Sequence, residues 1–368
     1  MKKLLLSMLA FVAVTSCKEK EEPKAALTIP TSYTSTNYDA NTATERALRT
    51  QLATLTTEMK TAEKGTALTS AKITELFNVG NPSLKSITGS YYVQKLEGQW
   101  FTELVNSSGK VYDPLKPNTT GGVFGARLLD AGGLETLQVI EKGLFGAAFY
   151  NYAVGLMNNN STEKTIDQLV AIYGASPAFP NTNTAAKTPT PDAFIATYAA
   201  RRDKNDGNGF YSKIKNTFLK AQAAVKAGSA YNAERDEAFT TLKIEMEKAV
   251  MATVIHYNFA ALTKLSTTNP PATTLSGALH DLGEGVGFLH GFKAVPQAQR
   301  KITDAQIDEF LALIQNINNG KTEMFKFVSD PSSLAKIQTA STKIQALYGF
   351  TAAEMEDFKK NWIAEQAR

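Results

Sequence analysis

The chain has 368 residues, of which 43% are hydrophobic and 20% are charged, and its formal net charge is +4. This length and apolar content suffice for one large domain or two ordinary ones. Subtracting Lys2 and Lys3, which belong to a leader, from +4 leaves +2, and this near balance does not indicate a nucleic-acid partner, which needs basic residues gathered on one face. The single cysteine excludes an intrachain disulfide and a cluster of thiolate metal ligands.

Residues 1–16 have the layout of a secretory signal peptide, because two lysines precede an apolar run that ends in small residues. The run is too short for a membrane span, which needs about 20 residues. Its end, Val14-Thr15-Ser16-Cys17, resembles a bacterial lipobox. That resemblance implies cleavage before Cys17 and lipidation of this residue, so that acyl chains anchor the protein. The alternative is an ordinary signal peptide followed by a chance cysteine.

We expect residues 17–42 to form a lipidated, disordered tether. The charged block Lys18-Glu19-Lys20-Glu21-Glu22 directly follows the cysteine, and such blocks stay solvated. An acidic run at this place also looks like the export tags that send some lipoproteins to the outer face of the outer membrane. The sequence therefore predicts an outer-membrane lipoprotein, periplasmic or surface-exposed with surface exposure favoured, whose membrane contact is its lipid anchor.

Helical periodicity follows the tether. Thr42 and Glu45 have the spacing of a capping box, and apolar residues then recur every three or four positions up to Met59. The segment 91–105 suits a strand at its start, but the four-residue spacing of its apolar residues favours a helix. We expect helices at residues 43–65, 72–78 and 91–105, followed by a loop over residues 106–122.

Residues 133–157 are apolar on nearly every side, which is typical of a helix buried in the interior. Four prolines mark residues 174–192 as a loop, and we place the boundary between two helical bundles, residues 43–180 and 181–368, near this loop. Strand signals are scarce, so the sequence predicts an all-α fold. Further helices are expected at residues 167–173, 211–225, 234–265, 275–292, 304–318, 331–348 and 352–366.

The densest group of chemically useful residues lies in the helix expected at residues 275–292. At about 100° per residue, His280, Glu284, Gly287 and Gly291 share one face, and His280 can touch Glu284 four residues away. Each glycine costs a helix about 1 kcal/mol relative to alanine. We therefore expect close packing against a neighbouring helix to compensate. His290 points about 80° away from His280 and is not expected to join it.

Two interpretations of this face stay open. The imidazole and carboxylate can form a structural hydrogen bond that fixes the register of the helix, or they can belong to a ligand or metal site. A metal site needs three or more protein ligands, so the predicted set is His280, Glu284 and His256, with Glu245 and Glu141 as further candidates. Iron or another divalent metal would be the cofactor.

Other motifs point to no particular chemistry. No nucleophile elbow, Walker lysine loop or His-Glu-x-x-His run is present, so we predict no catalytic residue and lean against an enzyme. Several aromatic side chains suit ligand stacking, although their positions are more typical of core or docking residues. They are Tyr33, Tyr38, Tyr91, Tyr92 and Trp100.

Four segments together resemble the domain-of-unknown-function family DUF4856, a family of lipid-anchored helical proteins. They are residues 29–33, the helix start at Arg46 and Leu48, residues 141–147, and the stretch from His280 to Leu289. The resemblance spans nearly all of the chain that follows the signal peptide. Residues 167–177 preserve only part of the family's aromatic, acid-containing segment.

The chain is more distantly similar to the imelysin group, whose signature is Gly-x-His-x-x-Glu. Here Gly277 lies three residues before His280 and Glu284 lies four after it, so only His280 and Glu284 carry over. This resemblance implies a fold of two packed helical bundles and the handling of metal or haem. We therefore predict a non-enzymatic lipoprotein that binds a small ligand or a metal, iron included. The alternatives are a metallopeptidase-like hydrolase and a structural component that docks partners in a surface complex.

Overall fold

The structure, a computed structural model, describes residues 24–114, 116, 118–159 and 161–368. The predicted signal peptide and Cys17 lie outside these residues. The all-α prediction is confirmed: helices dominate, and the one sheet within the described part is the antiparallel pair of β1 (Gly122–Phe124) and β2 (Arg127–Leu129). None of the described helices combines the length and the apolar character that crossing a membrane requires.

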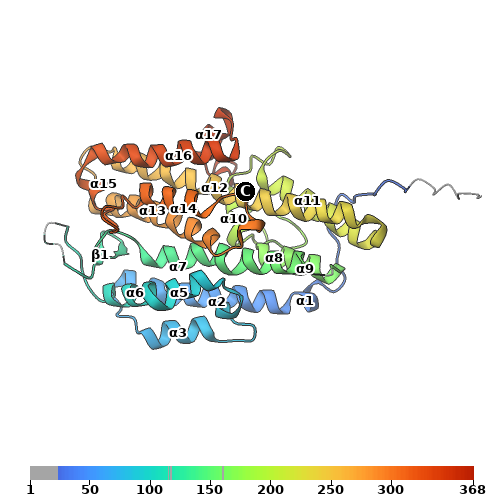
Figure 1. Cartoon of the computed structure of the whole chain (residues 1–368), viewed down its shortest axis with the longest axis horizontal. Helices are drawn as coiled ribbons and strands as arrows, with labels where there is room; N and C mark the ends of the chain where they lie inside the picture. Colours follow the sequence, from blue (N-terminus) through green and yellow to red (C-terminus); the bar gives the residue numbers. More distant parts are fainter. Residues whose placement is uncertain (1–23, 115, 117, 160) are drawn as a thin grey trace, which may run out of the picture.

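The first helices form the lower layer of Figure 1. The predicted helix at residues 91–105 exists, but it contains a π-helical turn, η2 (Leu96–Trp100), which inserts one extra residue into the helix. The layer consists of α1 (Tyr38–Asn41), α2 (Ala43–Lys60), η1 (Thr61–Lys64), α3 (Ser70–Asn78), α4 (Leu84–Ile87), α5 (Ser90–Lys95), η2 and α6 (Phe101–Ser107).

The middle layer contains the helix predicted at residues 133–157 and the shorter helix that follows it. Every residue of its first two segments is buried, as its apolar character predicts. A second π-helical turn lies in its centre. The layer comprises α7 (Thr136–Leu144), η3 (Phe145–Tyr150), α8 (Asn151–Met157) and α9 (Glu163–Tyr173).

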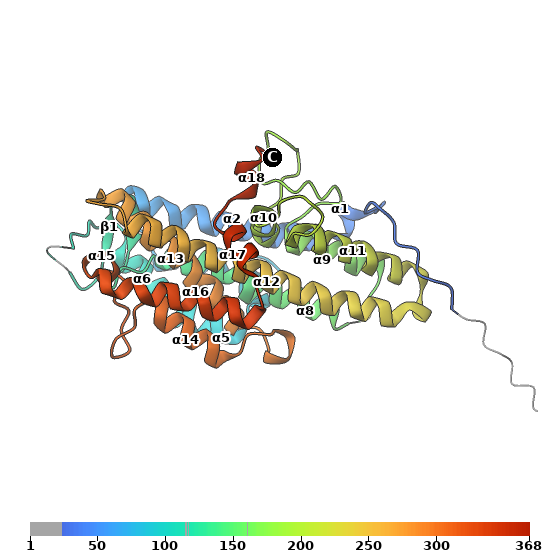
Figure 2. The same cartoon turned by 90° about the horizontal axis from the view of Figure 1, so that it is seen from above.

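The remaining helices form the upper layer, in which α12 packs against α13 and α16 (Figure 2). The helix α10 was not predicted, because the prolines before it give no helical start signal and its first residue, Phe194, has a φ of 51°. The layer comprises α10 (Phe194–Arg201), α11 (Phe210–Ala227), α12 (Asn232–Leu265), α13 (Ala272–Lys293), α14 (Asp304–Ile314), α15 (Lys326–Ser329), α16 (Ala335–Tyr348), α17 (Ala352–Phe358) and α18 (Trp362–Glu365).

One hydrophobic cluster extends from Tyr33 to Ile363. Because α7 packs on α13 and α9 packs on α11, the chain segments 43–180 and 181–368 share this core. The middle layer therefore belongs to both, and its contacts with α13 position the predicted site.

Residues 24–42 differ from the tether that we expect over residues 17–42. Tyr33 is buried and its hydroxyl donates to Asp167 Oδ1 at 2.7 Å, while the Tyr231 hydroxyl donates to the carbonyl of Ala25 at 2.9 Å. This segment lies on the folded body because it buries an aromatic ring. It starts at the turn between α11 and α12, at the end of the molecule opposite β1 (Figure 1).

The predicted capping box at the start of α2 does not form. The Thr42 hydroxyl donates to the carbonyl of Tyr38 at 2.7 Å and not to the α2 backbone. Glu45 turns inward and accepts hydrogen bonds from Tyr152 and Gln168, each at 2.9 Å. The carboxylate is thereby used in the contact between α2 and the middle layer.

Candidate polar site between α7 and α13

The glycines of α13 let it lie directly on α7. A Cβ added at Gly291 would lie 2.4 Å from the carbonyl oxygen of Gly143, and one at Gly287 would lie 2.6 Å from the carbonyl oxygen of Gln138. Both distances are far below van der Waals contact. The prediction that close helix packing offsets the cost of these glycines is thus confirmed at Gly287 and Gly291.

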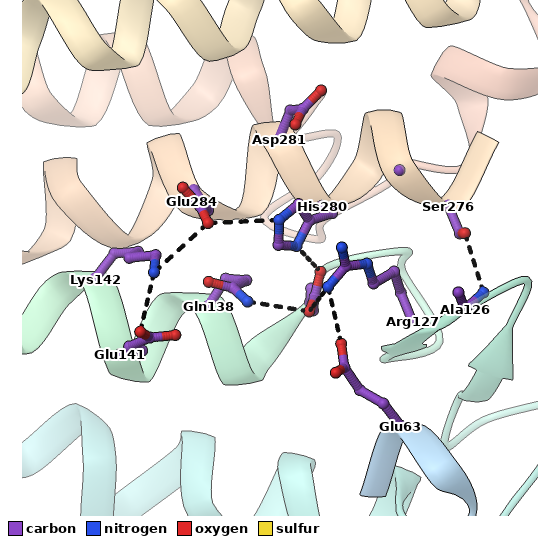
Figure 3. Close-up of polar contacts among 12 residues, drawn as sticks. Glu63, Ala126, Arg127, Gln138, Glu141, Lys142, Ser276, His280, Asp281 and Glu284 are labelled. Atoms are coloured by element: carbon purple, nitrogen blue, oxygen red, sulfur yellow. Dashed lines mark hydrogen bonds and ion pairs between the residues drawn. The ribbon is translucent and has the colours of Figure 1, made fainter. Parts of the chain in front are cut away.

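His280 lies between two carboxylates. Its Nδ1 is 2.8 Å from Glu135 Oε2, and its Nε2 is 3.4 Å from Glu284 Oε1 (Figure 3). The contact with Glu284 confirms the proximity predicted from their spacing. Burial lowers the pKa of His280, but the charge and hydrogen bond of Glu135 and the charge of Glu284 outweigh it, so that its pKa is raised above the ordinary value. An imidazolium, which donates from both nitrogens, fits this arrangement.

Lys142 of α7 joins Glu284 to a second carboxylate. Its Nζ lies 3.5 Å from Glu284 Oε1 and 3.0 Å from Glu141 Oε1, and its side chain is 7% exposed. Burial alone would lower the pKa of Lys142. The charge of Glu284 is the largest of the opposing effects, which together hold this pKa well above its ordinary value. Burial likewise raises the pKa of Glu284, while Lys142 and His280 bring it below its usual value. Glu284 is therefore an anion held between two buried cations.

Two further cations, Arg127 and Lys60, extend the network on the α7 side. Arg127 Nη1 lies 3.1 Å from Glu63 Oε1 and 3.9 Å from Glu135 Oε1, and Lys60 Nζ lies 3.8 Å from Glu141 Oε2. With His280 protonated, the cations balance the carboxylates in number. The carboxylates are Glu63, Glu135, Glu141 and Glu284, and the cations are Lys60, Arg127, Lys142 and His280. We call these residues the α7–α13 network.

The structure brings His280 and Glu284 together but does not gather the predicted metal ligands into a group of three. His256 Nδ1 lies 2.8 Å from the carbonyl oxygen of Phe358, and burial, with Arg202, lowers its pKa to about 3. Glu245 pairs with Lys248 at 3.4 Å. Both nitrogens of His280 already face carboxylates, and the described residues contain no group of three or more His, Cys, Asp or Glu side chains that could hold a metal ion. Metal binding by His280, Glu284 and His256 stays a prediction without structural support.

Sequence reasoning missed Glu135 and Lys142 as members of the site. Glu135 precedes α7 by one residue and lies 145 positions from His280, so no local spacing relates them. The membership of Lys142 could have been predicted, because a lysine within a helix that is otherwise apolar on all sides must have a buried partner.

A cleft of about 580 Å³ lies where α5, η2 and α6 face α13 and α14, and no residue of the network lines it. Tyr91, Trp100 and His290 form its aromatic wall: the Tyr91 hydroxyl lies 3.1 Å from His290 Nδ1, and the Trp100 ring centroid is 5.1 Å from that of His290. Burial, with Lys95 and Lys293, lowers the pKa of His290 to about 3, so this ring is neutral. We call this space the aromatic cleft.

Three basic and three acidic residues also line the aromatic cleft, so its charged side chains balance. They are Lys95, Lys293, Lys321, Glu103, Asp130 and Asp308. The volume falls within the range of small-molecule sites. Of the aromatic residues considered for ligand stacking, Tyr91 and Trp100 line this cleft. Trp100 is also buried in the core, as are Tyr33 and Tyr92.

The comparison with protein families identifies the region that contains α13. Residues 172–351 match the model of a domain of unknown function (DUF4856), and they include His256, His280 and Glu284. The resembling segments at residues 29–33, 46–48 and 141–147 lie outside this match. No curated protein and no solved structure matches the chain. The family match thus supports the resemblance to DUF4856 over residues 172–351.

Proposed function

We propose that this chain is a lipid-anchored outer-membrane protein that binds a small, uncharged polar ligand, such as a sugar, in the aromatic cleft and catalyses no reaction. The observation that carries the proposal is the aromatic wall of a cleft of about 580 Å³. Aromatic faces bind the apolar faces of ring-shaped ligands, and the charged and polar side chains around them can accept or donate hydrogen bonds. Because these charges balance, they favour a ligand without net charge.

The α7–α13 network supports this function indirectly. His280 and His290 belong to the same helix, α13, and Lys293 of α13 also lines the cleft. The network ties α13 to α7, so we infer that it fixes one wall of the cleft. Its imidazolium and carboxylates act as structural groups in this proposal.

The proposal also orients the molecule on the membrane. The described chain starts beside the turn between α11 and α12, where Lys24 pairs with Glu234. One end of the aromatic cleft is formed by Asp130 and Gly132, which directly follow β2 at the opposite end of the molecule (Figure 1). A ligand would thus reach the cleft from the side away from the anchored end.

An experiment with a neutral mono- and oligosaccharide array tests the binding function. The soluble chain starting at Lys18 should bind at least one sugar and change its intrinsic fluorescence, because Trp100 lines the cleft. The chain has two tryptophans, so Trp362→Phe should retain the signal and Trp100→Phe should lose it. Tyr91→Ala should weaken binding about tenfold or more, given the loss of a stacking face.

The matched control is Tyr231→Ala, which removes the same type of side chain at the α11–α12 turn. Tyr231 is not one of the residues that line the cleft. This variant should leave the affinity unchanged. An array without any bound sugar, or equal affinity of Tyr91→Ala and wild type, would count against the proposal.

The anchor itself is tested by Cys17→Ser. We expect this variant to lose incorporation of radiolabelled palmitate and to move from the membrane fraction to the soluble fraction, because several acyl chains supply the durable attachment. Cys17 lies outside the described residues, and the described body has its own core, so the helical circular dichroism of the released protein should match wild type. A Cys17→Ser protein that stays in the outer membrane would contradict the lipid anchor.

A further inference from the structure

We propose a second binding site, for a small organic anion with one carboxylate, in a cavity between α2 and the loop that leads to α10. The cavity has a volume of about 540 Å³. Arg49 and Tyr38 line one side, and Asp192, Ala193 and Phe194 line the other. We call it the Arg49 cavity. It shares no lining residue with the aromatic cleft, so it stands independently of the proposed function.

Arg49 is a half-buried cation whose charge is offset only in part, by Asp192 in the same cavity. Its Nη1 donates to the carbonyl oxygen of Ala171 at 3.2 Å, and this is its one hydrogen bond within the described residues. No carboxylate there forms an ion pair with it, although a guanidinium carries five N–H donors. Burial is the main effect on the pKa of Arg49 and lowers it, which reflects a charge partly removed from water. An anion entering the cavity would satisfy these donors.

The ring of Phe194 fixes the place of this guanidinium. Arg49 Cζ lies 5.5 Å from the ring centroid, within the range of a cation–π contact. The ring is held in turn by Phe145 and Phe149, with centroid separations of 5.3 and 4.9 Å. Phe194 has a φ of 51°, a left-handed conformation that is unfavourable for a bulky residue and persists only where its surroundings enforce it.

The neighbouring charges indicate a singly charged ligand. Arg46 Nη1 pairs with Asp39 Oδ1 at 3.0 Å, so these two lining residues neutralise each other. Both oxygens of Asp192 face the protein, since they accept from the Tyr211 hydroxyl at 2.7 Å and from the Thr182 amide at 2.9 Å. Burial raises the pKa of Asp192 to about 7, so its negative charge is partial near neutral pH.

These observations leave a net positive charge of between zero and one in the cavity, carried by Arg49 and partly offset by Asp192. The planar fork of a guanidinium matches a carboxylate with two parallel hydrogen bonds. A phosphate monoester carries close to two negative charges at neutral pH, which exceeds the positive charge of Arg49 and adds repulsion from Asp192. The charge balance therefore favours a monocarboxylate.

The test is isothermal titration of the soluble chain, starting at Lys18, with benzoate and with phenyl phosphate at pH 7. Benzoate should bind in the millimolar range or tighter, and more tightly than phenyl phosphate. Arg49→Gln should weaken benzoate binding about tenfold or more, because it removes the charge-assisted hydrogen bonds. The benzoate affinity of Arg49→Lys should lie between those of wild type and Arg49→Gln, since lysine keeps the charge but lacks the planar fork of donors.

Arg46→Gln is the matched control, because it removes the same charge from the rim of the same cavity. Its benzoate affinity should stay within about threefold of wild type, as expected for a solvent-exposed pair. If Arg49→Gln does not fold, the benzoate affinity of Arg49→Lys tests the proposal instead. The proposal is overturned if wild type gives no heat of binding with benzoate, if the Arg49 variants bind as wild type does, or if phenyl phosphate binds more tightly.

Discussion

Replacing Gly291 with alanine is expected to lower the free energy of unfolding by about 3 kcal/mol, the upper part of the usual range for overpacking. The added methyl group would lie 2.4 Å from the carbonyl oxygen and 3.0 Å from the Cα of Gly143. These are backbone atoms of α7, so no side-chain rotation can relieve the contact. The two helices would have to separate, and the residues of the α7–α13 network would move apart with them. Urea unfolding at neutral pH measures the effect.

Gly277→Ala is the control for this prediction. Gly277 belongs to the same helix, but the nearest atoms to an added Cβ are in the flexible side chain of Lys264, at 3.8 Å. Alanine is a better helix former than glycine by up to about 1 kcal/mol, so this variant should be as stable as wild type or more stable. Similar losses in the Gly277 and Gly291 variants would show that contact with α7 is not the cause.

Replacing Lys142 with methionine is expected to cost about 3–5 kcal/mol, because removing one partner of a buried ion pair leaves the other charge uncompensated. Methionine keeps most of the volume of the lysine stem, so the loss would come mainly from charge. Glu284 and Glu141 would lose a common cation, and the second oxygen of each, Oε2, already lacks a hydrogen-bond partner among the described residues. Chemical unfolding monitored by circular dichroism measures the change.

Two comparisons make this second prediction specific. Adding Glu284→Gln to Lys142→Met removes the stranded carboxylate and should recover part of the lost stability. Lys72→Met, on the surface of α3, breaks an exposed pair with Glu75 at 3.1 Å and should have little effect. If Lys142→Met is as mild as Lys72→Met, the α7–α13 network does not stabilise the fold.

The sequence predicted the parts of this site that depend on one helix. The four-residue spacing placed His280 beside Glu284, and the repeated glycines of α13 predicted a close neighbour. The buried character of the middle helix also followed from its composition. Each of these statements needs only the geometry of a helix and the cost of its residues.

The partners across the helix interface could not be predicted in the same way. Glu135 meets His280 only because α7 and α13 pack parallel in one particular register, with Gly287 on Gln138 and Gly291 on Gly143, which a single sequence does not specify. The choice between metal ligand and structural pair depended on this missing partner, since Glu135 occupies the second ring nitrogen of His280. The π-helical turns at Leu96–Trp100 and Phe145–Tyr150 could not be predicted from the spacing of the apolar residues either.

The central claim is that His280 is a buried imidazolium that links Glu135 and Glu284, and it has a defined pH dependence. A histidine whose folded pKa is raised contributes stability that is fully present below the unfolded pKa, about 6.5, and is lost as the pH rises through the folded pKa. The raised pKa of His280 therefore predicts a loss of stability on the alkaline side. His280→Gln should remove that loss.

The most direct measurement is a pH titration of the three histidine side chains in the folded protein by NMR, with resonances assigned through the single His→Gln variants. We predict that His280 titrates above 6.5, whereas His256 and His290, whose burial lowers each pKa to about 3, stay neutral down to acid pH. Addition of zinc or ferrous ions should leave the His280 resonances in place. A His280 pKa below 6.5, or a metal-dependent shift of its ring signals, would contradict the account.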